Sequence, residues 1–139
     1  MKSASYVLIV SEKNECAETI QQVGKKRVGK NKVFRVDEPS AALPLLNKMG
    51  LVNRKIPAYI FLSTDIERSK IKAFLNLLDR DYPFASHGRV VLIDANFKLN
   101  QLMSLAISDS VGQFINCPVL PIEIESVLNQ SIMPVGMMA

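Results

Sequence analysis

Three short runs of consecutive apolar residues constrain the fold of this chain more than any other feature. They are YVLIV at 6–10, AYIFL at 58–62 and VVLI at 90–93. Such β-branched and aromatic runs are typical of strands buried on both faces of a parallel sheet. Two further strand-like segments, 33–36 and 113–116, mix apolar with polar residues, as edge strands do. The pattern predicts five parallel strands in the order 2-1-3-4-5, with the second and fifth at the edges.

Segments with the spacing of amphipathic helices separate these runs. Each has an apolar stripe along one helix face, formed by Cys16, Ile20 and Val23, by Ala42, Leu45, Leu46 and Met49, by Ile71, Phe74, Leu75 and Leu78, and by Leu99, Leu102, Met103 and Ala106. A fifth helix, opened by Pro121, is predicted by Ile124, Val127, Leu128 and Ile132. Pro44 disfavours an early start of the second helix, so we expect Ser40 as its N-cap and Gly50 at its end. The predicted fold is a three-layer α/β domain with a doubly wound parallel sheet.

The length of 139 residues fits one domain, with an ordered core at about 6–132 and a loose tail at 133–139. The apolar run near the start is too short for a signal peptide or a membrane span. Cys16 and Cys117 match neither a metal-site spacing nor the framework of a secreted protein. We therefore expect a cytoplasmic protein, with Cys16 as a small apolar core residue and Cys117 as a partly accessible thiol.

The positive charge of the chain is concentrated in one place. The net charge is +4, and a segment at 24–35 without acids holds six cations, namely Lys25, Lys26, Arg27, Lys30, Lys32 and Arg35. Such a local cluster fits a solvated connection or a small anion site better than nucleic-acid binding along the whole surface. The G-x-x-x-x-G-K pattern at 24–30 is not a nucleotide loop, because it follows a helix and leads into a strand.

Polar residues follow the predicted strands. In open α/β sheets the carboxyl ends of the strands form the functional edge. These ends carry Ser11 and Glu12, then Ser63, Thr64 and Asp65, then Asp94, and finally Asn116 and Cys117.

At these positions the sequence resembles the receiver domain of two-component response regulators (CheY-like). The segment VLIVSEKN at 7–14 stands where that family has an apolar strand ending in two acidic residues. PAYIFLS at 57–63 stands where it has Pro-Asp, four apolar residues and the acceptor Asp. INCPVLPIEIESVL at 115–128 stands where it has apolar-Thr-Lys-Pro and the last helix. The resemblance, over about 6–132, implies a flavodoxin-like fold and a role in two-component (phosphorelay) signal transduction.

The chain departs from this family at nearly every chemical position. Ser11 and Glu12 replace the acidic pair, Ser63 the acceptor Asp, Asp94 the hydroxyl residue that reads the phosphate, and Cys117 the Lys. Phosphoryl transfer relies on magnesium and a cation to neutralise charge. We therefore expect a degenerate pseudo-receiver that is not phosphorylated at the usual position, is not an enzyme and needs no cofactor.

Two alternatives remain open at this edge. Glu12, Asp65 and Asp94 could hold a magnesium or calcium ion through their carboxylate oxygens, or they could simply be solvated loop residues. Asp65 could also serve as an offset phosphoryl acceptor, which would make the chain a working response regulator.

The resemblance implies protein partners, namely a histidine kinase, another receiver domain or a second copy of this chain. The family's output surface consists of the fourth helix, fifth strand and fifth helix. In this chain we expect Phe114 and Ile115 on that surface, with Phe114 standing where the family has its switching aromatic residue. We expect no contact with a membrane. Nucleic acid is not an expected partner, but an anion or nucleic-acid contact through the basic cluster at 24–35 remains an alternative function.

Overall fold

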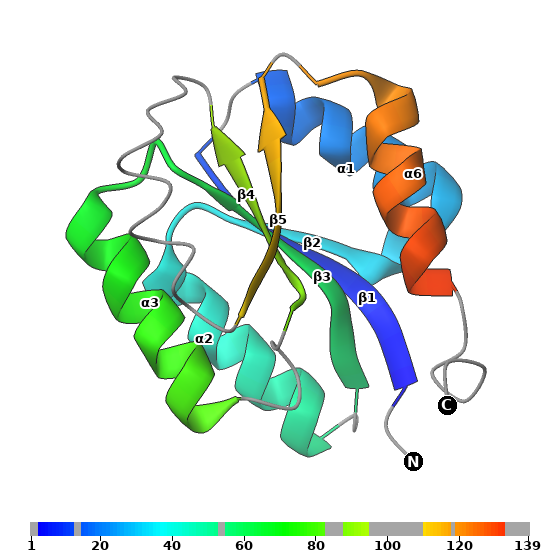
Figure 1. Cartoon of the computed structure of the whole chain (residues 1–139). Coiled ribbons are helices and arrows are strands. Elements are labelled where there is room, and N and C mark those ends of the chain that lie inside the picture. Colours follow the sequence, from blue (N-terminus) through cyan, green and yellow to red (C-terminus); the bar gives the residue numbers. More distant parts are fainter. Residues whose placement is uncertain are drawn as a thin grey trace.

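A computed structural model describes residues 3–12, 15–52, 55–82, 88–94, 110–117 and 119–132 (Figure 1). Its elements are β1 (Ser3–Val10), α1 (Glu15–Arg27), η1 (Lys30–Lys32), β2 (Val33–Val36), α2 (Pro39–Asn47), η2 (Lys48–Val52), β3 (Lys55–Ser63), α3 (Arg68–Asp81), β4 (Val90–Asp94), β5 (Val111–Asn116) and α6 (Pro121–Ile132). The predicted helix around Leu99, Leu102, Met103 and Ala106 and the predicted tail at 133–139 lie outside the described residues.

The five strands form one sheet in the order β2-β1-β3-β4-β5, and every neighbouring pair is parallel. The predicted order is therefore confirmed, including β2 and β5 at the edges. β1 pairs with β2 from Val7 to Val10 and with β3 over most of its length. This central position explains its uninterrupted apolar run, because both of its faces are covered.

Two helical layers cover the sheet (Figure 1). α1 and α6 lie side by side on one face, and α2 and α3 lie on the other. Val7 and Ile9 of β1 belong to the apolar cluster beneath α1 and α6. Leu8 and Val10 belong to the cluster beneath α2 and α3. Alternation along one strand thus supplies both cores, and the predicted three-layer α/β fold is confirmed.

α2 begins earlier than the sequence predicted. Its first residue is Pro39 and its N-cap is Glu38, so Pro44 lies inside the helix and Ser40 is not the N-cap. Proline suits the first helical position because its φ is preset and its missing N–H would have no helical partner there. Pro44 leaves the Ser40 carbonyl without its usual donor. Both residues are exposed, so solvent can replace that bond.

The end of α2 also differs from the prediction. Gly50 lies within η2, a turn of π-helix that continues directly from Asn47. Its φ is not positive, in contrast to those of Gly29 and Gly88. Gly50 is therefore not a left-handed helix cap, and the chain turns toward β3 after an added helical turn.

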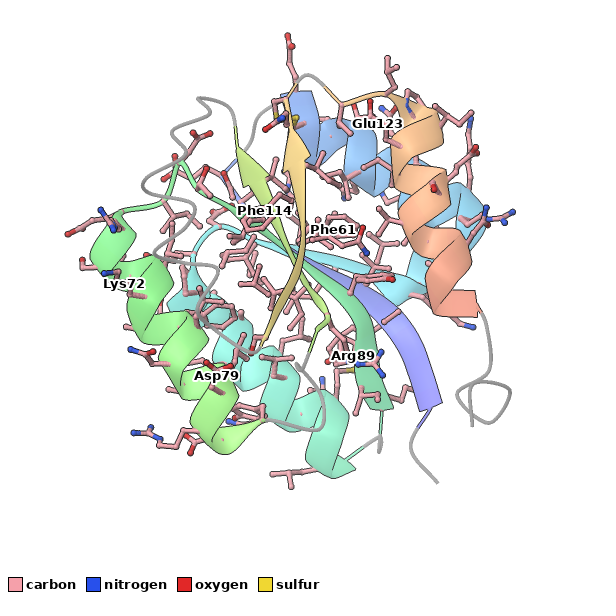
Figure 2. All side chains as sticks on the ribbon, in the orientation of Figure 1. Phe61, Lys72, Asp79, Arg89, Phe114 and Glu123 are labelled. Atoms are coloured by element: carbon pink, nitrogen blue, oxygen red, sulfur yellow. A yellow bond between two sulfur atoms is a disulfide. The ribbon has the colours of Figure 1, made fainter. Side chains whose placement is uncertain are left out.

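The start of β5 is fixed by contacts with two other segments. The backbone N–H and the hydroxyl of Ser110 both donate to Asp79 Oδ1 of α3, at 3.1 and 2.7 Å. Figure 2 shows Asp79 on the side of α3 that faces this strand. A Cβ on Gly112 would overlap the Gly88 carbonyl oxygen, so this close approach requires glycine. These contacts hold the start of β5 against α3 and the segment before β4.

Candidate functional site

Ser11 follows β1 and is fully buried. Its backbone N–H donates to the Val36 carbonyl oxygen at 2.9 Å, and its hydroxyl donates to the Glu12 carbonyl oxygen at 2.8 Å. These bonds join the ends of β1 and β2. Glu12 is exposed. The pair therefore presents one carboxylate at this edge, beside a serine hydroxyl that bonds the local backbone.

Ser63 ends β3 and is only 2% exposed. Its Oγ accepts a hydrogen bond from the Asp65 backbone N–H at 3.2 Å. The backbone N–H and the hydroxyl of Thr64 both donate to the Ile93 carbonyl oxygen of β4, each at 2.9 Å. The turn at 63–65 is thus tied to the neighbouring strand, with Ser63 inside and Asp65 exposed to solvent.

The strand ends meet at one edge, as the parallel order requires. Val10 of β1 pairs with Leu62 of β3, and Asp94 of β4 pairs with Asn116 of β5. The backbone of each predicted site segment therefore lies at this edge. The side chain of Asp94 is outside the described part of the chain, so its place among the three carboxylates stays a prediction.

A metal site at this edge also stays a prediction. Among the side chains that the structure describes, no three His, Cys, Asp or Glu residues are grouped closely enough to hold a metal ion. That statement covers Glu12 and Asp65 but not Asp94. Hard cations take oxygen ligands, so these three carboxylates remain a chemically suitable set.

The two cysteines form a disulfide bond. Cys16 in the first turn of α1 is bonded to Cys117, with their Cα atoms 6.1 Å apart. Cys16 is a core residue, as predicted, but the expectation that Cys117 carries a partly accessible free thiol is wrong. The fold supplies the reason, because the side-by-side packing of α1 and α6 brings the start of α1 to the connection between β5 and α6 (Figure 1).

The sequence places both cysteines at the same edge of the predicted sheet but does not show that they are bonded. Cys16 belongs to the buried stripe of the first helix, and Cys117 directly follows the last strand. Both positions lie at the carboxyl edge of a doubly wound sheet. A sequence separation of 101 residues does not bear on their distance in space. Topology, and not cysteine spacing, was the relevant guide.

The basic cluster lies away from the strand ends. Lys25, Lys26 and Arg27 form the last turn of α1, where cations interact favourably with the helix dipole. Arg27 donates a hydrogen bond to Asn129 Oδ1 of α6. Arg35 donates to Glu18 Oε1 and Gln21 Oε1 of α1, each at 3.1 Å. Exposed side chains in the remainder of the cluster are those of Lys25, Lys26, Lys30 and Lys32. The two arginines thus stabilise the fold, and an anion site at the lysines stays a prediction.

Exposed apolar side chains lie on both sides of the last strand. Phe114 pairs with Leu92 of the α2–α3 core, so its side chain points to that face, whereas Leu120 and Ile122 lie at the start of α6 on the other face. Phe114 is 45% exposed on β5, Leu120 is 60% exposed before α6, and Ile122 is 68% exposed in its first turn. Phe114 can be followed on β5 in Figure 2. Ile115 is instead buried in the core, so the expectation that it contributes to a surface is wrong. Leu120 and Ile122 were missed, although Ile122 lies off the buried stripe of its helix.

Among the described residues, no helix combines the length and apolar character needed to cross a membrane. Neither a comparison with family models nor one with curated protein sequences gives a match.

Solved structures do match the chain. A two-component response regulator from Cytophaga hutchinsonii matches with a TM-score of 0.74 and 14% identity, over 94% of this chain and 98% of that one. One from Legionella pneumophila matches with a TM-score of 0.68 and 17% identity, over 91% and 96%. The phosphorylated cyanobacterial phytochrome response regulator matches with a TM-score of 0.67 and 15% identity, over 92% and 91%. The chain therefore has the fold of response-regulator receiver domains.

Proposed function

We propose that this chain is a cytoplasmic, non-enzymatic signalling module of a two-component system, which acts by binding another protein and is not phosphorylated at the usual position. The observation that carries the proposal is which residues stand at the carboxyl ends of the strands. Where the resembling family has an acceptor Asp and a Lys, this chain has a buried Ser63 and a Cys117 that is bonded to Cys16.

These residues are poorly suited to phosphoryl transfer. That reaction depends on positioned positive charge around the transferred group. A disulfide sulfur at position 117 supplies no charge and no N–H donor. Ser63 accepts a hydrogen bond from the backbone of Asp65 and has little contact with solvent. The edge thus lacks the charge pattern of the reaction, while β5 and α6 of the family's output surface are both formed.

The surface of β5 and α6 supports a binding role. We call Leu120 and Ile122, which follow β5 at the start of α6, the β5–α6 apolar patch. β5 is the last strand in the sheet order, and an edge strand favours contact with other chains or must be covered. Apolar groups grouped on a surface commonly mark protein-binding sites. The partner we propose is a histidine kinase, another receiver domain or a second copy of this chain.

The test is the association of the purified protein, alone and mixed with kinases and receiver domains from the same genome, followed by light scattering. We expect a complex that Ile122→Asp and Leu120→Asp weaken at least tenfold. Leu51→Asp is the matched control, because Leu51 is 80% exposed but lies in η2, away from the patch. Equal weakening by all three variants, or a protein that stays monomeric with every partner, contradicts the proposal.

Phosphoryl acceptance by Asp65 is the second candidate. The observation that favours it is the exposure of Asp65 on the turn that directly follows β3. The protein is incubated with acetyl phosphate and magnesium, and its intact mass is measured. We expect an unchanged mass. A stable gain of one phosphoryl group that Asp65→Asn abolishes would replace the proposed function with this one.

A further inference from the structure

We propose that the Cys16–Cys117 bond is a site of reversible oxidation, opened by a dithiol reductant through thiol–disulfide exchange, and that its state controls the β5–α6 apolar patch. The redox site stands on the geometry of the two cysteines. Its consequence for partner binding rests on the proposed function.

The bond joins two segments at the point where the patch begins. Cys117 directly follows β5, and α6 begins at Pro121. Leu120 lies between them with 60% of its surface exposed, and its carbonyl oxygen accepts hydrogen bonds from the first turn of α6. At the other side of the bond, Cys16 belongs to the first turn of α1. The disulfide therefore tethers the connection that carries part of the patch to a neighbouring helix.

The two cysteines differ in the exposure of the whole residue. Cys16 is 5% exposed and lies in the apolar cluster beneath α1 and α6. Cys117 is only partly buried and packs at the margin of that cluster. The more exposed residue, Cys117, is therefore the side of the bond that we propose a thiolate from solvent attacks first. Access of this kind is one of the factors that decide whether a disulfide exchanges.

Thiol–disulfide exchange with a dithiol needs no further reagent. A thiolate of the dithiol attacks Cys117 Sγ, the bond between the cysteines breaks, and Cys16 leaves as a thiolate that takes up a proton. The second thiolate of the reductant then attacks the reductant sulfur bound to Cys117, which leaves Cys117 as a thiol after protonation. Two electrons pass to the cysteine pair, and the reductant becomes a disulfide.

The reduced protein is expected to keep its fold. Ile115, Val119 and Ile124 flank the bond on the β5–α6 side, and each is at most 7% exposed. These buried side chains keep β5 in the sheet and α6 packed against it without a covalent link. The stretch at 116–120 loses its tether, so its backbone and Leu120 gain freedom. Disulfides in a reducing cytoplasm are usually transient or redox-sensing, which fits a bond with these properties.

The first test uses dithiothreitol on the folded protein. After treatment at neutral pH without denaturant, N-ethylmaleimide is added and the intact mass is measured beside the circular dichroism spectrum. We expect two maleimide additions per chain and an unchanged spectrum. Amide hydrogen exchange at 117–124 should rise at least tenfold on reduction.

Single variants test the order of attack. Cys16→Ser leaves Cys117 alone, and incubation with oxidised glutathione should give a mixed disulfide at least tenfold faster than in Cys117→Ser, which leaves the buried Cys16. The double variant Cys16→Ser/Cys117→Ser is the control, because its exchange pattern should already resemble that of the reduced protein and should not respond to dithiothreitol.

Two outcomes overturn the proposal. The bond is purely structural if dithiothreitol opens it only in concentrations of denaturant that unfold the chain. If reduction leaves amide hydrogen exchange at 117–124 unchanged, the disulfide does not control the β5–α6 apolar patch. These outcomes do not depend on the proposed function. A protein without partners can still show both redox responses, and a protein whose bond never opens can still form a partner complex.

Discussion

The two faces of the sheet are held together in different ways. The layer beneath α2 and α3 is stabilised by burial and by noncovalent polar contacts, such as the hydrogen bonds from Ser110 to Asp79 and the ion pair between Lys70 and Glu38. The apolar cluster there includes Leu8, Leu62, Phe74, Leu78 and Leu92. A hollow of about 310 Å³ lies between α2 and α3, and one of about 440 Å³ lies beside η2. Beneath α1 and α6, burial is supplemented by a disulfide at one end of the layer and an Arg27–Asn129 hydrogen bond.

This difference has a functional consequence. Burial is distributed over many side chains, so no single event in the cell removes it. A disulfide concentrates stability in one bond that a two-electron reaction can open. The face with that bond also carries Leu120 and Ile122 of the β5–α6 apolar patch. A signal can therefore act on this layer and leave the α2–α3 layer as a stable base.

Loss of the disulfide should have the largest effect. In the chain-entropy model, a bond closing a loop of about 100 residues stabilises the native state by about 4–5 kcal/mol, and this bond spans 101 residues. We expect Cys16→Ser/Cys117→Ser to lower the free energy of unfolding by about this amount in urea titrations. Wild-type protein in dithiothreitol should match the variant. A loss below about 1 kcal/mol would show that packing dominates on both faces.

Two matched leucines sharpen the comparison. Leu78 of α3 and Leu128 of α6 are both fully buried, on opposite faces of the sheet. Replacement of either by alanine should lower the free energy of unfolding by about 2–5 kcal/mol. The cost of Leu128→Ala should differ between oxidised and reduced protein by more than about 0.5 kcal/mol, because both changes act on one layer. The cost of Leu78→Ala should be the same in the oxidised and the reduced protein. An equal difference for both variants would contradict the independence of the two faces.

The strands could be predicted because burial on both faces leaves a direct trace in the sequence. Runs such as YVLIV at 6–10 need no information about partners. Helix ends were less predictable. Ser40 is a good N-cap residue, but the N-cap is Glu38 and α2 starts at Pro39, two positions earlier than predicted, because proline fits the first turn. Weak local preferences of this kind are decided by the surrounding packing.

The position of the candidate site in the fold could be predicted from the sequence, but the bond formed by its cysteine could not. Its residues follow the strands, so topology alone brings Ser11, Ser63 and Cys117 to one edge. The bond between Cys16 and Cys117 depends on how α1 packs beside α6, which no single segment encodes. The exposure of Leu120 likewise depends on where α6 begins. Contacts between distant segments therefore had to come from the structure.

The smallest expected effect compares one tyrosine hydroxyl on each face. Tyr6 lies in the α2–α3 core, 1% exposed, with its ring edge-on to Phe34. Its hydroxyl is buried and has no hydrogen-bond partner among the described residues. Tyr59 lies in the α1–α6 core and forms a side-chain hydrogen bond with Gln113. A buried polar group without a partner destabilises the native state, whereas a bonded one contributes to stability.

Tyr6→Phe should therefore raise the free energy of unfolding by about 1 kcal/mol, and Tyr59→Phe should lower it by a similar amount. Burial raises the pKa of Tyr6 above its ordinary value of 10.0. Above about pH 10 the unfolded chain releases the Tyr6 proton while the native chain retains it. The contribution of this group to the free energy of unfolding is therefore fully present below that pH and is lost progressively above it. Urea titrations between pH 7 and 11 should show a shallower alkaline loss in Tyr6→Phe than in wild type. A destabilised Tyr6→Phe at pH 7 would show that the hydroxyl is bonded, and the contrast between the two faces would not extend to their tyrosines.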